Sequence, residues 1–155
     1  GNYTPSTPEE KVDAAISDVK NVANSVENST GGKVKASVVE TSVDVENKTA
    51  SVDVEVAAPG LDLSNATDKA SVSAAVTKVV KEVVDSADKD TTVTINADGT
   101  DIPDVPYPVK KLTDAKIKEL VNKYVKAENY EVGTTADVTV TVAGVEMTYS
   151  ISLSK

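Results

Sequence analysis

The chain has 155 residues, of which 39% are hydrophobic and 26% are charged, a composition typical of one globular domain with a hydrophobic core. It has no Cys, His, Phe, Trp, Arg or Gln, which excludes thiol and imidazole catalysis, serine–histidine triads and ordinary zinc or copper sites. Its net charge of -9 and its lack of guanidinium groups argue against nucleic-acid binding, and no apolar run is long enough for membrane insertion.

The first six residues, GNYTPS, resemble a flexible tether, and we predict that residues 7–155 form a single domain. A helix begins this domain. Thr7 is its expected cap, Pro8 suits the first helical position and Glu10 completes a capping box. A Gly-Gly pair at residues 31–32 is expected to end it. One face is apolar at three-and-four spacing: Val12, Ala15, Ile16, Val19, Ala23 and Val26.

Residues 39–58 alternate in the way that predicts a β-hairpin. We expect Val45 to pair with Ala50 across a turn at residues 46–49, and we expect a bulge where Val38 and Val39 break the alternation. The expected buried face contains Val39, Thr41, Val43 and Val45 on one arm and Ala50, Val52, Val54 and Val56 on the other. The expected solvated face contains Asp44, Glu46, Asp53 and Glu55.

A second helix is predicted over about residues 67–87, after a break at Pro59 and Gly60. Its buried side is almost entirely β-branched, so packing rather than helix propensity should hold it. The side consists of Val72, Ala75, Val76, Val79, Val80 and Val83.

The stretch TVTINADGTDIPD, residues 92–104, resembles half of a calcium loop. With Gly99 at loop position 6, Asn96 and Asp98 occupy ligand positions, but Thr94 and Val105 stand where an EF-hand needs strong carboxylate ligands. We therefore favour a strand that runs into an Asp-Gly turn. Calcium bound by Asn96, Asp98 and Asp101 stays open as an alternative, and no other cofactor is expected.

The proline-rich segment that follows is the best place for a ligand site. Tyr107 lies between Pro106 and Pro108, in a loop stiff enough to present side chains, and Asp101 and Asp104 lie nearby. We favour the alternative, a rigid crossover with Tyr107 packed on the edge of the domain.

A third helix is predicted to start at the cap Thr113, with Ile117, Leu120, Val121, Tyr124 and Val125 on one stripe. The clearest hairpin follows. A two-residue turn at Ala143 and Gly144 predicts four pairs: Val142 with Val145, Val140 with Met147, Val138 with Tyr149, and Ala136 with Ile151.

These elements, in the order α-ββ-α-β-α-ββ, predict an α+β fold. We expect a two-layer sandwich in which three helices cover one face of an antiparallel sheet of about five to six strands. One strand must lie at the edge. Lys33, Lys35 and the acidic outward positions could protect it from pairing, although alternation does not show which strand it is.

The missing catalytic residue types favour a non-catalytic extracellular module, namely a spacer, adhesin-like or protein-interaction domain of a larger bacterial surface or envelope protein. Composition and the tether suggest the extracellular location. Two alternatives remain: a small ligand- or calcium-binding domain that uses the acidic region 85–108, and a designed or simplified protein without a natural function. A protein partner is compatible with the sequence but is not identified by it, whereas the scarcity of aromatic rings argues against carbohydrate.

Overall fold

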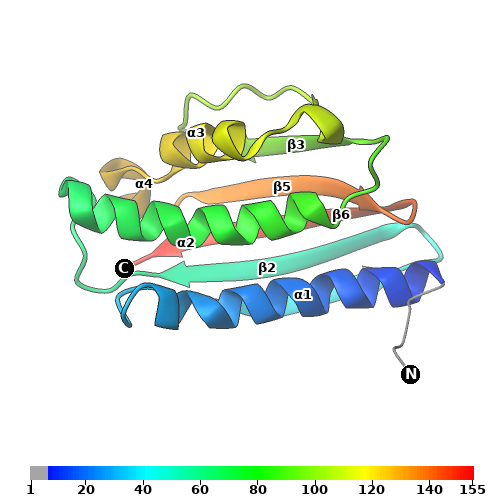
Figure 1. Cartoon of the computed structure of the whole chain (residues 1–155), viewed down its shortest axis with the longest axis horizontal. Coiled ribbons are helices and arrows are strands. Elements are labelled where there is room, and N and C mark those ends of the chain that lie inside the picture. Colours follow the sequence, from blue (N-terminus) through cyan, green and yellow to red (C-terminus); the bar gives the residue numbers. More distant parts are fainter. Residues whose placement is uncertain (1–6) are drawn as a thin grey trace.

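The computed structural model describes residues 7–155, so the tether predicted for residues 1–6 lies outside the described residues. One six-stranded sheet forms a layer, and helices lie against it (Figure 1). The strands are β1 (Lys35–Asp44), β2 (Thr49–Ala57), β3 (Thr92–Ala97), β4 (Tyr107–Pro108), β5 (Thr135–Val142) and β6 (Val145–Ser154). The helices are α1 (Pro8–Ser29), α2 (Ala66–Asp85), α3 (Asp114–Tyr124), α4 (Ala127–Val132) and a short 3-10 helix (Val109–Lys111).

The strand order is β1-β2-β6-β5-β3-β4, and α1, α2 and α3 lie on the same side of this sheet (Figure 1). The predicted α+β fold, with helices over one face, is therefore confirmed. All neighbouring strands are antiparallel except β2 and β6, which are parallel. Alternation predicts which side chains share a face, but it carries no information on how strands from distant parts of the chain are oriented.

The ends of α1 follow the predicted chemistry. The Glu10 backbone N–H donates to the Thr7 hydroxyl over 3.1 Å, which is the N-cap bond of the predicted capping box, and that hydroxyl donates to the Glu10 carboxylate over 2.9 Å. Gly31 and Gly32 both have positive φ, which ends the helix. All six apolar residues predicted for its inner face are buried.

The other helices agree in part. The stripes predicted for α2 and α3 are buried, and the Thr113 hydroxyl caps α3 through the Lys116 backbone N–H. The six-residue α4 was not predicted, because so short a helix has no readable periodicity. It is fixed by tertiary hydrogen bonds: the Tyr130 hydroxyl donates to the Ala58 carbonyl, and the Asn129 amide donates to the Tyr124 carbonyl.

The hairpin of β5 and β6 pairs as predicted at all four positions. A side chain far along the sequence holds its turn. The Asp88 carboxylate accepts the backbone N–H groups of Ala143 and Gly144 over 2.9 and 3.1 Å. Asp88 therefore serves the structure of the turn.

The hairpin of β1 and β2 differs from the prediction by two residues. Val43, not Val45, pairs with Ala50, and residues 45–48 form the turn. The Asp44 side chain causes this, because it accepts from the backbone and side-chain N–H groups of Asn47 and so closes the turn earlier. The predicted bulge is present between Val38 and Glu40. Val39, Thr41 and Val43 are exposed, so the expectation that these three residues are buried was wrong.

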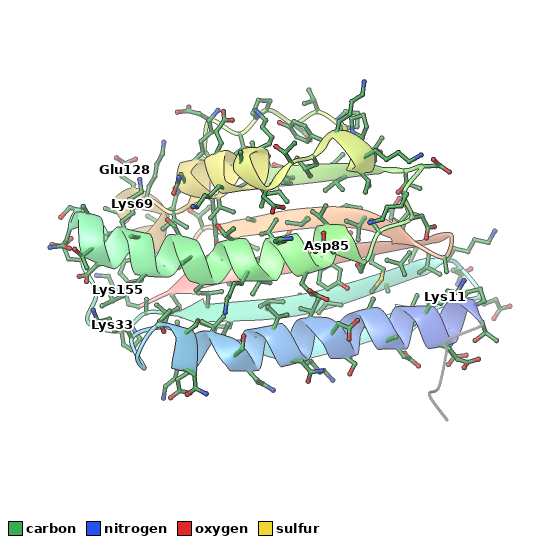
Figure 2. All side chains as sticks on the ribbon, viewed as in Figure 1. Lys11, Lys33, Lys69, Asp85, Glu128 and Lys155 are labelled. Carbon is green, nitrogen blue, oxygen red and sulfur yellow. The ribbon has the colours of Figure 1, made fainter. Side chains whose placement is uncertain are left out.

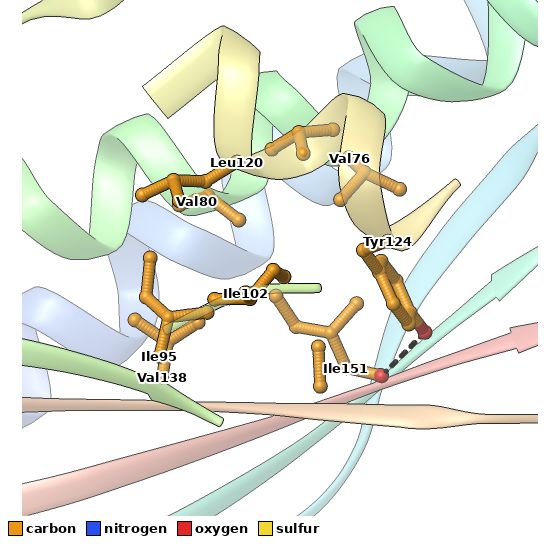
Figure 3. A pocket seen from close by; sticks show the side chains of 10 residues that line it. Val76, Val80, Ile95, Ile102, Leu120, Tyr124, Val138 and Ile151 are labelled. Carbon is orange, nitrogen blue, oxygen red and sulfur yellow. Dashed lines mark hydrogen bonds between the residues drawn. The ribbon is translucent and has the colours of Figure 1, made fainter. Parts of the chain in front are cut away.

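The buried residues of all these elements form one hydrophobic cluster between the helices and the sheet. A cavity of about 10 Å³ remains among α2, α3 and the strands, with apolar walls except for Tyr124 (Figure 3). That volume is close to the space of one water molecule. In residues 7–155 no helix has the length and apolar character that crossing a membrane requires.

Candidate functional site

The face of the sheet away from the helices has no covering layer in residues 7–155, and we call it the open face. Strand alternation sends the valines of β2, β5 and β6 toward the helices and sends short polar side chains to the open face. Hydroxyls predominate there, and carboxylates come next. A polar face of this kind is the usual solvated side of a sheet. Polarity alone is therefore no evidence of a binding site, and the positions of the side chains relative to one another have to be considered.

The registers align these polar side chains into rows across the strands. One row, the acid row, contains Glu40, Asp53, Ser150, Asp137 and Asn96 from β1, β2, β6, β5 and β3. The next row is made only of hydroxyls: Ser42, Ser51, Thr148, Thr139 and Thr94. Each row brings together residues from both ends of the chain.

Hydrogen bonds between strands hold several of these side chains in place. The Ser150 hydroxyl donates to the Asp137 carboxylate over 2.8 Å, and the hydroxyl oxygens of Thr139 and Thr148 lie 3.2 Å apart. Side chains fixed in this way lose little conformational entropy when something binds to them.

The open face has an excess of negative charge. Its carboxylates are Glu40, Asp44, Asp53, Glu55, Asp137 and Glu146, and Lys35 at the start of β1 supplies an ammonium group. None of these six carboxylates forms an ion pair within residues 7–155, and Lys35 instead lies 3.8 Å from Glu27 of α1. Glu40 and Asp53 stand directly opposite each other, an arrangement of like charges that is unfavourable for the sheet.

Two shallow depressions lie on the open face. One, of about 240 Å³, is near the β1–β2 turn and contains Asp44 and Glu146. Hydrogen bonds from Asn47 hold the pKa of the Asp44 carboxyl below its ordinary value. The other depression, of about 320 Å³, lies at the opposite corner and contains Asn96, Asp98 and Asp137.

The structure brings together two of the three candidate calcium ligands. Asn96 and Asp98 line the second depression, but Asp101 is directed to Lys126, whose ammonium group lies 3.5 Å from its carboxylate. The Asp98–Gly99 turn itself is present: the Thr100 backbone N–H donates to the Ala97 carbonyl. Across residues 7–155, no three carboxylates are close enough to hold a metal ion together.

The candidate ligand site does not come together as one pocket. Tyr107 pairs with Val93 at the sheet edge and is half-buried against the core, and the Lys116 ammonium group lies 6.0 Å from the centre of its ring. Asp104 is exposed in the loop, and Asp101 lies beside Lys126. This placement agrees with the rigid crossover that we favoured.

A further depression, of about 400 Å³, lies between α2 and α3. Its walls include Thr77, whose hydroxyl has no hydrogen-bond partner, and Ile117. The ammonium group of Lys81 lies 3.5 Å from the carboxylates of both Asp85 and Asp114 at this groove, and these carboxylates raise the Lys81 pKa. The groove thus combines an apolar wall with an ion pair that is already satisfied.

Burial changes the pKa of further titratable side chains that lie away from the open face. It raises the pKa of the Tyr124, Tyr130 and Tyr149 hydroxyls. Burial, aided by repulsion from Asp18 and Asp85, also raises the pKa of the Glu82 carboxyl.

The acid row was predicted only in part. Alternation identified Asp53 as outward-facing, but not its neighbours Asp137 and Glu40. The same alternation in residues 135–142 would have marked Asp137 as outward. No sequence signal reveals that β2 lies beside β6, and this contact is what joins the two halves of the row.

Comparisons with protein-family models, with curated proteins and with solved structures found no match to this chain. The function of this chain is therefore inferred from the geometry of its open face.

Proposed function

We propose that this chain is a non-catalytic protein-interaction domain, and that the open face of its sheet binds a basic surface of a partner protein. The main evidence for this function is the acid row. Glu40, Asp53 and Asp137 lie in one line across the strands without a cation beside them. Lysine or arginine side chains from a partner would relieve this repulsion and increase the rate of association.

The cavities support a non-catalytic role. The cavity in the core has a volume of about 10 Å³ and apolar walls, too small for a substrate. The pKa values raised by burial belong to Tyr124, Tyr130, Tyr149 and Glu82, which lie away from the open face. A flat face with several separated carboxylates suits recognition of a protein surface better than enclosure of a small molecule.

A lysine-rich peptide of ten residues is the probe for a first test. We expect it to shift the backbone amide signals of β2, β5 and β6 in NMR spectra of the labelled protein and to leave those of α1 and α2 unchanged. Salt should weaken binding, because exposed charges are screened. A glutamate-rich peptide of the same length is the control.

Two variants with equal loss of charge make this test specific. Asp53→Asn with Glu146→Gln removes two carboxylates from the open face, whereas Asp13→Asn with Glu128→Gln removes two exposed carboxylates from helices. We expect only the first variant to bind the lysine-rich peptide more weakly. Equal weakening by both would show that net charge alone drives binding and would contradict the proposal.

A place on the outside of a bacterial cell is a separate part of the proposal. It is supported by composition, because the chain is acidic and rich in Thr, Ser and Asn; the absence of cysteine is compatible with this location but does not favour it. Antibody labelling of intact cells that produce the natural protein tests this part. Labelling that requires permeabilised cells would refute it without affecting the interaction proposal.

Calcium binding is the second candidate, because Asn96, Asp98 and Asp137 line one depression. A thermal melt after EDTA treatment, with and without calcium and with magnesium as a control, tests it. At a hundredfold excess over the dissociation constant, a bound ion would stabilise the fold by roughly 2.7 kcal/mol. A calcium-specific rise that Asp98→Ala removes would support this candidate, and an unchanged melt would leave the segment as a turn.

A further inference from the structure

The two edges of the sheet differ in their capacity to accept another strand. An edge strand presents unpaired backbone N–H and C=O groups, which form a template for pairing with another chain. At one edge, β4 has two residues, one of them Pro108, and a proline cannot donate a backbone hydrogen bond. At the other edge, β1 has ten residues without a proline. The β1 edge is therefore the one that can pair over a useful length.

The β1 edge also exposes apolar side chains. Four large hydrophobic side chains are exposed in residues 7–155, and two of them, Val39 at 58% and Val43 at 38%, belong to β1. Val43 faces the helix side but is not covered there. The first turns of α1 lie against the β5–β6 turn, where Lys11 and Ala14 share a depression with Val142. A second layer is therefore missing over the last residues of β1.

Charge is distributed unevenly along this strand. Lys35 is its first residue, with Lys33 two residues earlier, and Asp44 is its last, with Glu46 two residues later. Lys35 lies 3.8 Å from Glu27 of its own α1, but both side chains are exposed, and a surface ion pair of this kind contributes little to stability. Figure 2 shows Lys33 at one end of the molecule and Lys11, near the start of α1, at the other. An antiparallel pair of identical strands places the basic end of each strand against the acidic end of the other.

Because of the bulge, an antiparallel register exists in which open-face residues of one copy lie opposite open-face residues of the other, and helix-side residues lie opposite helix-side residues. Before the bulge, Lys35 and Ser37 face the open side, and after it Ser42 and Asp44 do. Residues directly opposite in an antiparallel pair must share a face. A two-fold axis between Val39 and Glu40 satisfies this rule: it places Lys35 opposite Asp44 of the second copy and Ser37 opposite Ser42. Shifting the register by one residue would place open-face side chains opposite helix-side ones.

We propose that two copies of this chain associate through β1, antiparallel and in this register, to form one continuous sheet. The association covers the exposed Val39 and Val43 and pairs Lys35 with Asp44 of the second copy twice, once on each side of the axis. The first turns of α1 lie toward the β5–β6 turn and leave the last residues of β1 uncovered. In the antiparallel pair, this space lies beside the start of β1 of the second copy, so the α1 helices of the two copies can lie side by side. The inference goes beyond the proposed function, since it uses the edge of the sheet and not its open face.

Analytical ultracentrifugation of the whole chain, from micromolar to millimolar concentration, tests the association. We expect the mass to rise from that of one chain to that of two. Lys35→Glu should raise the dimer dissociation constant by about tenfold or more, because like charges then face each other at both symmetric positions. Asp44→Lys should do the same, and the two changes together should restore association. Lys126→Glu, which breaks an ion pair away from β1, is the control.

A mass of one chain at every concentration would overturn the proposal. So would a double variant that associates no better than the single variants, provided that circular dichroism shows all of them folded. This outcome leaves the open-face proposal intact, because peptide binding is measured on the monomer as well.

The register has its own test, since the chain has no cysteine. Chains carrying Ser37→Cys are mixed with chains carrying Ser42→Cys and oxidised, which should produce a disulfide-linked dimer rapidly, because the two positions are opposite. In the control, Ser51→Cys on β2 replaces Ser42→Cys. Equal rates of cross-linking in the two mixtures would contradict the proposed register.

Discussion

On the helix side of the molecule, lysines lie beside carboxylates, whereas on the open face carboxylates lie beside hydroxyls. Lys81 has Asp85 and Asp114 within 3.5 Å, and Lys110 lies 2.8 Å from Asp90. Within residues 7–155, Asp53 and Glu146 have no such neighbour. The stability of the fold requires only that the open face be polar, so the excess of negative charge there is not explained by folding alone.

The largest expected effect compares adjacent residues of β6 that point to opposite sides. Met147 is fully buried, and Met147→Ala should lower the free energy of unfolding by about 2–5 kcal/mol because it leaves a cavity. Thr148→Ala on the open face removes a hydroxyl that lies 3.2 Å from that of Thr139, so it should lower this free energy by only about 0.5–1.5 kcal/mol. Urea denaturation measures both, and a large loss for Thr148→Ala would mean that the open face contributes to stability after all.

A smaller effect separates two buried tyrosines of the helix side. The Tyr124 hydroxyl donates to the carbonyls of Thr134 and Ile151 over 2.7 and 2.9 Å (Figure 3 shows the second bond). Tyr124→Phe should therefore destabilise the fold by about 1–3 kcal/mol. The Tyr149 hydroxyl has only the Met147 sulfur at 4.0 Å, so Tyr149→Phe should be nearly neutral in the same denaturation experiment. Equal losses would contradict this difference.

Ionisation of the Glu82 carboxyl on the helix side should make the stability of the fold depend on pH. Its folded-state pKa is raised by burial and by Asp18 and Asp85, so ionisation of Glu82 opposes folding. As pH falls through this raised pKa toward the ordinary value, the protein should gain stability from this group. Glu82→Gln should remove this gain and make the fold more stable at neutral pH. Denaturation of both proteins at a series of pH values measures it, and parallel pH profiles would contradict it.

The smallest expected effect concerns the open face itself. Asp53→Asn should stabilise the fold by about 0.2–1 kcal/mol, because it removes the like charge opposite Glu40, while it weakens binding of the lysine-rich peptide. A gain in stability with a loss of binding is the signature of a residue kept for function. Asp13→Asn on α1 should change neither quantity. Destabilisation by Asp53→Asn would mean that the acid row has a structural role.

Local patterns in the sequence identified much of the covered side. The capping box at Thr7, the stripe of α1 and the four pairs of the β5–β6 hairpin all follow from spacing within one or two adjacent elements. The predicted register of the β1–β2 hairpin was wrong by two residues, and the reason is also local. The alternation of residues 39–56 allows several turns, and the choice was made by the Asp44 side chain, which binds Asn47.

The candidate sites were harder to predict, because they combine distant residues. Tyr107 was correctly placed on the edge of the domain. The calcium alternative grouped Asp101 with Asn96, but the Asp101 carboxylate lies beside Lys126 of the loop before α4. Loop conformation decided this, and sequence spacing does not encode it.

The sequence by itself determined the longer helices and strands and the apolar side of most of them, and it excluded catalysis based on histidine or cysteine, because these depend on composition and on short-range periodicity. The tertiary structure alone decided that β2 lies beside β6 and that β1 lies at an edge. Pairing between distant strands is set by the packing of the whole core. That pairing assembles the acid row and leaves β1 free for a second copy.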